Sequence, residues 1–268
     1  MENKVALQYK GFIETPNLWH GSAVLNLFQF DINPHNYQLS KSENFNEIRL
    51  GKRVEQFFCF QINKLPESSL IANNLQIKNK KITIGEIDAL LTKHELLFHV
   101  EIIYKFYLYD SKIKTVNDLY KWIGPNRKDT LIDKLNKLKN KQLPLLHSEN
   151  CKSSLSHLDL KIQDIKQSVC FKAQLFTPYK SKISDIAPLN KSCIFGFYIS
   201  YSKINQLKDY QFHIPKKIDW LVSPHNYVSW MCFSEAAKAL EIFITEKQSP
   251  MVWLKEDSKL QKCFITFW

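Results

Sequence analysis

Apolar and polar residues alternate over three consecutive stretches near the middle of the chain, and alternation of this kind predicts β-strands. These stretches are 70–77, 82–91 and 96–109. Apolar residues at helical spacing precede and follow them, and predict helices over 44–63, 116–123 and 128–143. Beyond these, the pattern predicts four strands and one helix, at 170–176, 193–201, 251–254, 263–268 and 234–246.

This order of elements predicts an α/β (α+β) fold with a mixed central sheet flanked by helices. Residues 1–42 show no clear period, so we expect an irregular segment that packs on the core through aromatic side chains. A polar stretch rich in Ser and Asn begins at residue 147, and such stretches are typical of boundaries. We therefore expect an N-terminal segment (1–42), a core (43–146) and a C-terminal α+β section (147–268) that can share the domain of the core.

The 268 residues are 44% hydrophobic and 24% charged, which is the composition of a folded protein. The net charge of +11 favours a polyanionic partner, although Lys-rich usage is also typical of AT-rich genomes. Isolated glycines exclude a phosphate-binding glycine loop, and scattered cysteines exclude a zinc site built on C-x-x-C pairs. No stretch reaches the about 20 apolar residues of a membrane span, and no signal sequence is recognisable. We expect a cytoplasmic protein without a membrane partner.

Charged residues interrupt the most apolar of the predicted strands. Alternation places Glu101 and Lys105 on one face of this strand, opposite an unbroken apolar set. The preceding strand carries Asp88, and a hairpin through residues 92–95 would lay it beside Glu101. Two carboxylates in an apolar setting repel each other unless a cation lies between them, and oxygen ligands suit Mg²⁺ or Mn²⁺. An internal ion pair without function is the simpler alternative.

A third acid lies on the helix that precedes the strands. Glu55 interrupts an apolar stripe of this helix, whereas Lys52, Arg53 and Gln56 are expected to project elsewhere. If Glu55 points inward, it would complete the metal ligands or hold a water molecule. Taken alone, an acid at such a position is more often an ordinary helix residue.

These residues together resemble a known nuclease superfamily. The motifs are L-G-K-R-V-E at 50–55, T-I-G-E-I-D at 83–88, H-V-E at 99–101 and K-F-Y-L at 105–108. An acid on a helix, G-E-I-D on a strand and a Glu followed by a Lys on the next strand resemble the PD-(D/E)XK superfamily, and G-E-I-D is especially similar to its Holliday-junction resolvases. More closely, the motifs resemble one uncharacterised bacterial family assigned to that superfamily. W-I-G-P-N at 122–126 and K-Q-L-P-L at 141–145 extend this resemblance, which covers most of the chain.

The resemblance implies a restriction-endonuclease-like core that needs Mg²⁺ or Mn²⁺. In such a core Asp88 and Glu101 would hold the metal, Glu55 would assist, and a strand Lys would orient or activate water. The superfamily places this Lys two residues after the Glu, where the present chain has Ile103. Lys105 is the next residue on that face, about 13 Å along the strand instead of about 7 Å. A bulge, or a lysine from another element, would also serve.

Basic residues concentrate just after the predicted strands. Residues 111–144 carry nine basic and three acidic side chains, a net charge of +6. On the last helix of this region, Lys134, Lys137 and Lys141 form a stripe that would follow a phosphate backbone. Gln142 lies on the apolar stripe of the same helix and would face the site, while Lys134 is a candidate for the displaced lysine. A solvated helix face explains the lysine stripe equally well.

These observations predict a metal-dependent nuclease that hydrolyses phosphodiester bonds, with DNA favoured over RNA as the partner and a dimer compatible with the sequence. Ile103 favours one alternative, a protein that keeps the fold and binds nucleic acid without cleaving it. Another alternative is an interaction module in which the charged residues form an ion-pair network. In the nuclease, the carboxylates of Asp88 and Glu101 must lie within about 5 Å, near enough to share one ion.

Overall fold

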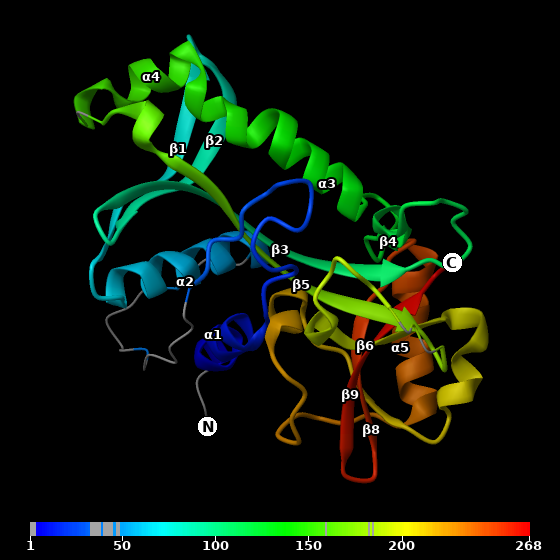
Figure 1. Ribbon diagram of the computed structural model, residues 1–268. Coiled ribbons are helices and arrows are strands. Elements are labelled where there is room, and N and C mark those ends of the chain that lie inside the picture. The colour runs from blue at the N-terminus through cyan, green and yellow to red at the C-terminus, as the bar shows by residue number, and fades with distance from the viewer. Residues whose placement is uncertain are drawn as a thin grey trace. The chain divides into compact units, whose positions relative to one another are not determined.

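The computed structural model describes residues 4–32, 39, 45–46, 49–158, 160–181, 183 and 185–268. These residues form a mixed parallel and antiparallel sheet flanked by helices (Figure 1), which confirms the predicted α+β class. By its contacts the chain divides into two compact units, here called the central and the terminal unit. The central unit comprises Asn17–Tyr104 and Asp133–Lys172, and the terminal unit comprises Met1–Pro16, Lys105–Ile132 and Ala173–Trp268. The units thus alternate along the chain. The division into residues 1–42, 43–146 and 147–268 stays a prediction.

The central unit is built around a long antiparallel hairpin. Its elements are α2 (Leu50–Lys64), β1 (Ser68–Asn79), β2 (Ile82–Lys93), the first part of β3 (Leu96–Tyr109), most of α3 (Leu131–Lys137), α4 (Glu149–Leu155) and the first part of β5 (Lys166–Pro178). His94 and Glu95 have positive φ, of 48° and 63°, and form the tight turn that joins β2 to β3. The pairing of β2 with β3 extends from this turn to Ala89, opposite Val100, which confirms the predicted hairpin.

Helices α2 and α4 cover opposite faces of β1 (Figure 1). Ile77 of β1 packs with Leu155 of α4 in one hydrophobic cluster. Asn74 of β1 accepts a hydrogen bond from Lys52 of α2, at 2.9 Å. Successive side chains of a strand point to opposite faces, so two positions three residues apart meet different helices.

A continuous helical run leads from α3 towards α4. After α3 it passes through a π-helical turn, Leu138–Gln142, and a 3-10 turn, Leu143–His147. The sequence predicted a helix over 128–143 that ends at Pro144, but the run starts later and continues past the proline. Pro144 lies in the first turn of the 3-10 segment.

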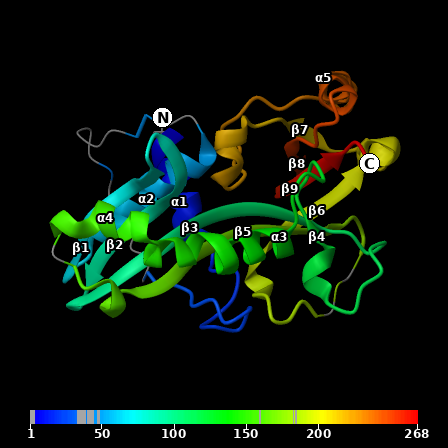
Figure 2. The ribbon, with the colours of Figure 1, turned by 90° about the horizontal axis from the view of Figure 1, so that it is seen from above.

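The terminal unit contains the remaining strands and the first and last helices. Its elements are α1 (Lys4–Glu14), the second parts of β3 and β5, β4 (Trp122–Ile123), β6 (Ile194–Ser200), β7 (Gln211–His213), α5 (Phe233–Thr245), β8 (Met251–Glu256) and β9 (Lys259–Thr266). Short 3-10 turns occur at Ser156–Leu158, Ile162–Asp164, Lys191–Cys193, Tyr201–Leu207 and Lys217–Leu221, the first two of them in the central unit. The strand order is β3-β5-β6-β9-β8-β7, with β4 beside β3. Leu240 of α5 packs with Phe212 of β7 and Leu254 of β8, and Figure 2 shows α5 near these strands.

Most predicted elements are confirmed, and two predictions were wrong. The N-terminal segment contains α1, although an irregular structure was expected. Gly11 lies in this helix because a Cβ there would come within 2.1 Å of the carbonyl oxygen of Leu221, and glycine weakens the helical signal in the sequence. Residues 116–123, expected to be helical, form a 3-10 turn at Asp118–Lys121 followed by β4. Residues 44 and 47–48, at the start of the predicted helix 44–63, lie outside the described residues.

Candidate metal and nucleic-acid site

Asp88 lies where the pairing between β2 and β3 ends. Its Oδ2 accepts a hydrogen bond from the backbone N–H of Ile102, at 2.9 Å, so its carboxylate lies beside the residue that follows Glu101. Burial, followed by the charges of Glu101 and Glu55, raises the pKa of Asp88 to about 7, and the Ile102 N–H and the charge of Lys134 oppose this shift. The two strand acids therefore repel each other in a poorly solvated setting, as the alternation predicted.

Glu101 is fully buried, and both of its carboxylate oxygens have partners. Oε2 accepts a hydrogen bond from Nε2 of Gln142, and Oε1 lies 3.1 Å from Nε2 of His99. The other ring nitrogen of His99 lies 3.2 Å from Nε2 of Gln167. An amide nitrogen only donates, so Nδ1 of His99 accepts, and Nε2 carries the proton that His99 donates to Glu101. The buried carboxylate is thus hydrogen-bonded on both sides.

The helical run from α3 brings one lysine into this network. Nζ of Lys134 donates to Oε1 of Gln142 at 2.7 Å, and the charge of Lys134 lowers the pKa of Asp88. Lys137 and Lys141 lie on the exposed side of the run. Of the four predicted nucleic-acid contacts, Lys134 and Gln142 therefore belong to the acidic site, and the other two lie at the surface.

Glu55 is held by a lysine that sequence reasoning assigned elsewhere. Nζ of Lys52 lies 2.8 Å from Oε2 of Glu55 and 2.6 Å from Oε1 of Glu86, so the expectation that Lys52 projects away was wrong. Burial raises the pKa of Glu55, and the hydrogen bond and charge of Lys52 oppose this shift. Lys52 and Glu55 lie three residues apart on α2, which is an ordinary spacing for two side chains of one helix to form an ion pair.

Lys105 belongs to the terminal unit, where its Nζ lies 2.7 Å from Oδ2 of Asp129. Both side chains are partly exposed. Ile103, two residues after Glu101, is buried. Lys105 is thus engaged in an ion pair, and the cation whose charge acts on Asp88 is Lys134.

The donor set of the central unit limits the metals that it fits. Among the described residues, no group of three or more His, Cys, Asp or Glu side chains is arranged to hold a metal ion. The three acids Glu55, Asp88 and Glu101 therefore do not form a preformed cage, and Glu55 is instead paired with Lys52. Two carboxylates still fit Mg²⁺ or Mn²⁺, which use one or two protein carboxylates and complete their shell with water and substrate phosphates.

Several residues that contact the acids of this site or their partners were not predicted to do so from the sequence. They are Lys52, Asn74, His99 and Gln167, whereas Gln142 was expected to face the site and donates to Glu101. The three-residue spacing of Lys52 and Glu55 was a usable signal. Gln167, in contrast, reaches His99 from a strand 68 residues away in sequence, and no local pattern marks such a contact.

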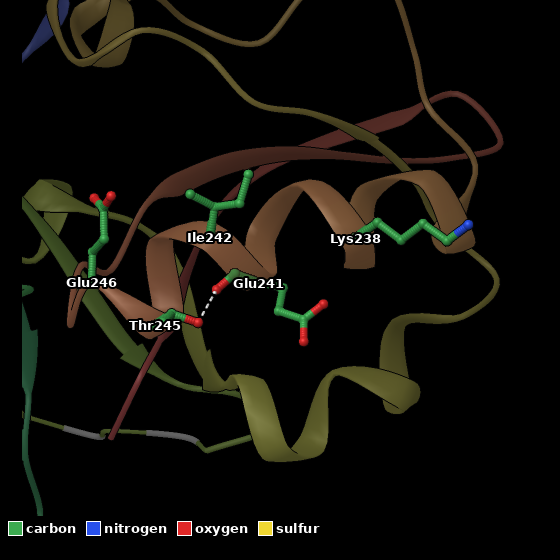
Figure 3. A pocket seen from close by; sticks show the side chains of 5 residues that line it. All are labelled: Lys238, Glu241, Ile242, Thr245 and Glu246. Carbon is green, nitrogen blue, oxygen red and sulfur yellow. Dashed lines mark hydrogen bonds between the residues drawn. The ribbon is translucent and has the colours of Figure 1, made fainter.

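A hollow on the surface of the terminal unit does not resemble a second site. Its lining residues come from the end of α5, and Figure 3 shows Lys238, Glu241 and Ile242 pointing in different directions. The hydrogen bond drawn there joins Oγ1 of Thr245 to the backbone oxygen of Glu241, at 2.9 Å, as in many helices. In the described part of the chain, no helix is both long and apolar enough to cross a membrane.

The fold and the site define a class, an α+β protein with a buried and mutually repelling carboxylate pair. Comparison with family models is more specific, since the model described as Domain of unknown function (DUF1853) matches residues 9–263. The chain therefore belongs to this family. No curated protein and no solved structure gives a significant match.

Proposed function

We propose that this protein is a metal-dependent nuclease of the PD-(D/E)XK type that hydrolyses phosphodiester bonds in DNA. One observation carries the proposal. Asp88 and Glu101 lie side by side at the point where two paired strands separate, and the charge of Glu101 acts directly on Asp88. A divalent cation between them would remove the repulsion.

In this proposal, Asp88 and Glu101 are the protein ligands of Mg²⁺ or Mn²⁺. When bound, such a cation lowers the pKa of water and neutralises charge that develops on the phosphate. The chain supplies the orientation, because the Ile102 N–H fixes Asp88, while His99 and Gln142 fix Glu101. Each carboxylate is thus held in place before the metal arrives.

Lys134 takes the role that the superfamily gives to the strand lysine. Its ammonium group is hydrogen-bonded to Gln142 and acts on Asp88, whereas Lys105 is paired with Asp129. A positive charge here would hold a phosphate group next to the carboxylates. Lys52 would keep Glu55 ionised and oriented at the edge of the site.

The basic charge supports a nucleic-acid substrate. Lys137 and Lys141 are exposed on the helical run that carries Lys134, and the chain as a whole has a net charge of +11. A duplex laid along this run would place phosphates near these lysines. The choice of DNA over RNA rests on the resemblance to Holliday-junction resolvases.

A specific observation also favours the second candidate, a nucleic-acid-binding protein without turnover. Both oxygens of Glu101 already have hydrogen-bond partners, and Lys105 is held in an ion pair. In that case the acidic network would serve the fold, and the basic helix would bind the nucleic acid.

The test is cleavage of linear, branched and single-stranded DNA with Mg²⁺ or Mn²⁺. We expect cleavage by the wild type that EDTA stops and that Asp88→Asn removes. The matched control is Asp133→Asn, an exposed acid on α3, which should cleave like the wild type. Cleavage that is equal in both variants would contradict the site, and binding without cleavage in the wild type would favour the second candidate.

A further inference from the structure

The terminal unit contains a small cavity that lies outside the carboxylate site. Its volume is about 250 Å³, below the about 300–1,000 Å³ that drug-sized ligands occupy, so it has room for one ring system. The lining combines aromatic rings with basic side chains, among them Tyr198, Trp268, Lys112 and Lys203. These residues come from separate segments of the chain that only the fold brings together.

The two aromatic rings are fixed by hydrogen bonds to the backbone. The hydroxyl group of Tyr198 donates to the carbonyl oxygen of Tyr109, and the indole N–H of Trp268 donates to that of Pro125, each at 2.9 Å. The ring centroids of Tyr198 and Trp268 lie 5.4 Å apart, at an angle of 46°. Rings held in this way present aromatic surface without losing conformational freedom on binding.

The G-P-N motif builds the turn that supports Trp268. A Cβ on Gly124 would come within 2.0 Å of Oδ1 of Asp129, so a larger residue would have to displace the Asp129 side chain. Arg127, in the left-handed region with φ of 55°, places its guanidinium 4.5 Å from the Trp268 ring centroid. The G-P-N motif, which is part of the W-I-G-P-N segment at 122–126, therefore helps to form the wall of this cavity.

The charges of the cavity favour an anionic group. Asp110 is a buried acid in the lining, but Arg127 lies 2.9 Å from its Oδ2, and its Oδ1 accepts the backbone N–H of Lys112 at 3.0 Å. Its charge is thus compensated within the wall. Lys112 and Lys203 are exposed and line the cavity, so two further positive charges face a ligand.

We propose that this cavity binds a nucleotide, whose base packs against Tyr198 and the side of Trp268 opposite Arg127 and whose phosphate meets Lys112 and Lys203. Fixed aromatic rings beside lysines are the arrangement that recognises a base with its phosphate. The nucleotide is either free in solution or an unpaired nucleotide of a polynucleotide. The proposal stands without the nuclease function, because it uses none of the residues of the carboxylate site.

The test is calorimetric titration of the full chain with dAMP, adenosine and a short oligothymidylate. We expect saturable binding of dAMP or of the oligonucleotide, and binding of adenosine about tenfold weaker than that of dAMP. The double variant Lys112→Ala/Lys203→Ala should weaken phosphate-dependent binding about tenfold or more, while Lys238→Ala, an exposed lysine on α5, should not. Trp268→Leu should weaken binding of every ligand about tenfold, with an unchanged melting temperature as the check of folding.

The arms of this experiment separate the two sources of the nucleotide. Binding of dAMP without binding of the oligonucleotide would identify a free nucleotide, and binding of the oligonucleotide that is much tighter than that of dAMP would identify an unpaired one. The proposal is overturned if neither ligand binds, or if the double lysine variant binds like Lys238→Ala. Asp88→Asn should bind dAMP like the wild type, so a failure of the nuclease proposal does not affect this result.

Discussion

Each unit of the molecule buries ionisable side chains, and the groups that surround them differ between the two units. In the terminal unit, Nζ of Lys262 donates to Oε1 of Gln174 at 2.9 Å and to the carbonyl oxygen of Trp220 at 2.7 Å. Burial lowers the pKa of Lys262 to about 7, and the charge of Glu14 opposes this shift. Lys262 therefore meets neutral acceptors and loses its proton readily.

The carboxylate pair in the central unit differs from Lys262, because each buried acid lies close to a second acid. Asp88 and Glu101 keep charged and polar partners around them, and their mutual repulsion is only partly offset by Lys134. Replacing a buried lysine by an apolar residue removes the cost of burying its charge, whereas in the proposed function two buried acids that repel each other would bind a cation. Removing the charge should therefore stabilise the protein at both sites, but only the carboxylate pair should respond to a divalent cation.

The substitution Lys262→Met should stabilise the protein near pH 6. A pKa lowered from 10.5 to about 7 corresponds to a cost of roughly 3–5 kcal/mol for the protonated lysine, while the two lost hydrogen bonds cost roughly 1–3 kcal/mol. Between about pH 7 and pH 10.5, Lys262 is protonated in the unfolded chain but deprotonated in the folded one. The stability of the wild type therefore rises with pH over this range. The variant lacks this rise and should be the less stable protein near pH 10.

Urea unfolding at pH 6, 8 and 10 measures this crossover. Lys259→Met is the matched control, because Lys259 is exposed on the same strand, β9. The control should follow the pH dependence of the wild type. A variant Lys262→Met that is less stable than the wild type at pH 6 would show that Lys262 is charged and paired in the core.

A divalent cation should raise the stability of the protein through the acidic pair, whereas it should have no effect through Lys262. In EDTA, Asp88→Asn should be more stable than the wild type by about 2 kcal/mol, because the neutral amide is not repelled by Glu101. Magnesium at 100 times its dissociation constant should stabilise the wild type by about 2.7 kcal/mol, and should leave Asp88→Asn unchanged. Thermal melts with and without Mg²⁺ measure both effects, and an equal Mg²⁺ response of the two proteins would contradict the metal site.

Gln142 tests whether the neutral members of the acidic network matter. Gln142→Leu removes the donor to Glu101 and the acceptor of Lys134, so it should destabilise the protein by about 1–3 kcal/mol. Asn136→Leu, an exposed polar residue of α3, makes the same chemical change outside the network and should alter the stability by less than about 0.5 kcal/mol. Denaturant unfolding distinguishes the two variants, and equal effects would mean that the network contributes nothing.

The sequence predicted the acidic pair well because it depends on local rules. Alternation defined β3 with the observed bounds, Leu96–Tyr109. A two-residue turn then sets the register of a hairpin, which places Asp88 next to Glu101. These two residues could therefore be paired from the spacing of apolar positions alone.

The partners of the charged residues could not be predicted in the same way. Alternation assigns a side chain to one face of a strand, but it does not say which helix covers that face. Lys105 lies on a strand face as expected, yet its ion pair with Asp129 depends on a turn 24 residues away in sequence. Lys52 reaches Glu86 through a flexible side chain, which no helical period describes. Lys262, buried in β9, carried no signal of its burial, because lysine is seldom found inside a protein.

The exposed lysines differ from both buried sites, because a solvated charge has almost no effect on the free energy of unfolding. Lys137→Gln and Lys141→Gln should each change the stability by less than about 0.5 kcal/mol. If the helical run contacts DNA, each substitution should also lower the slope of log affinity against log salt by about 1. Binding of a labelled duplex at several salt concentrations measures this slope, with Lys259→Gln as the control in the terminal unit. If the slope is the same in all three variants, Lys137 and Lys141 lie on a solvated face and do not contact DNA beside the acidic pair.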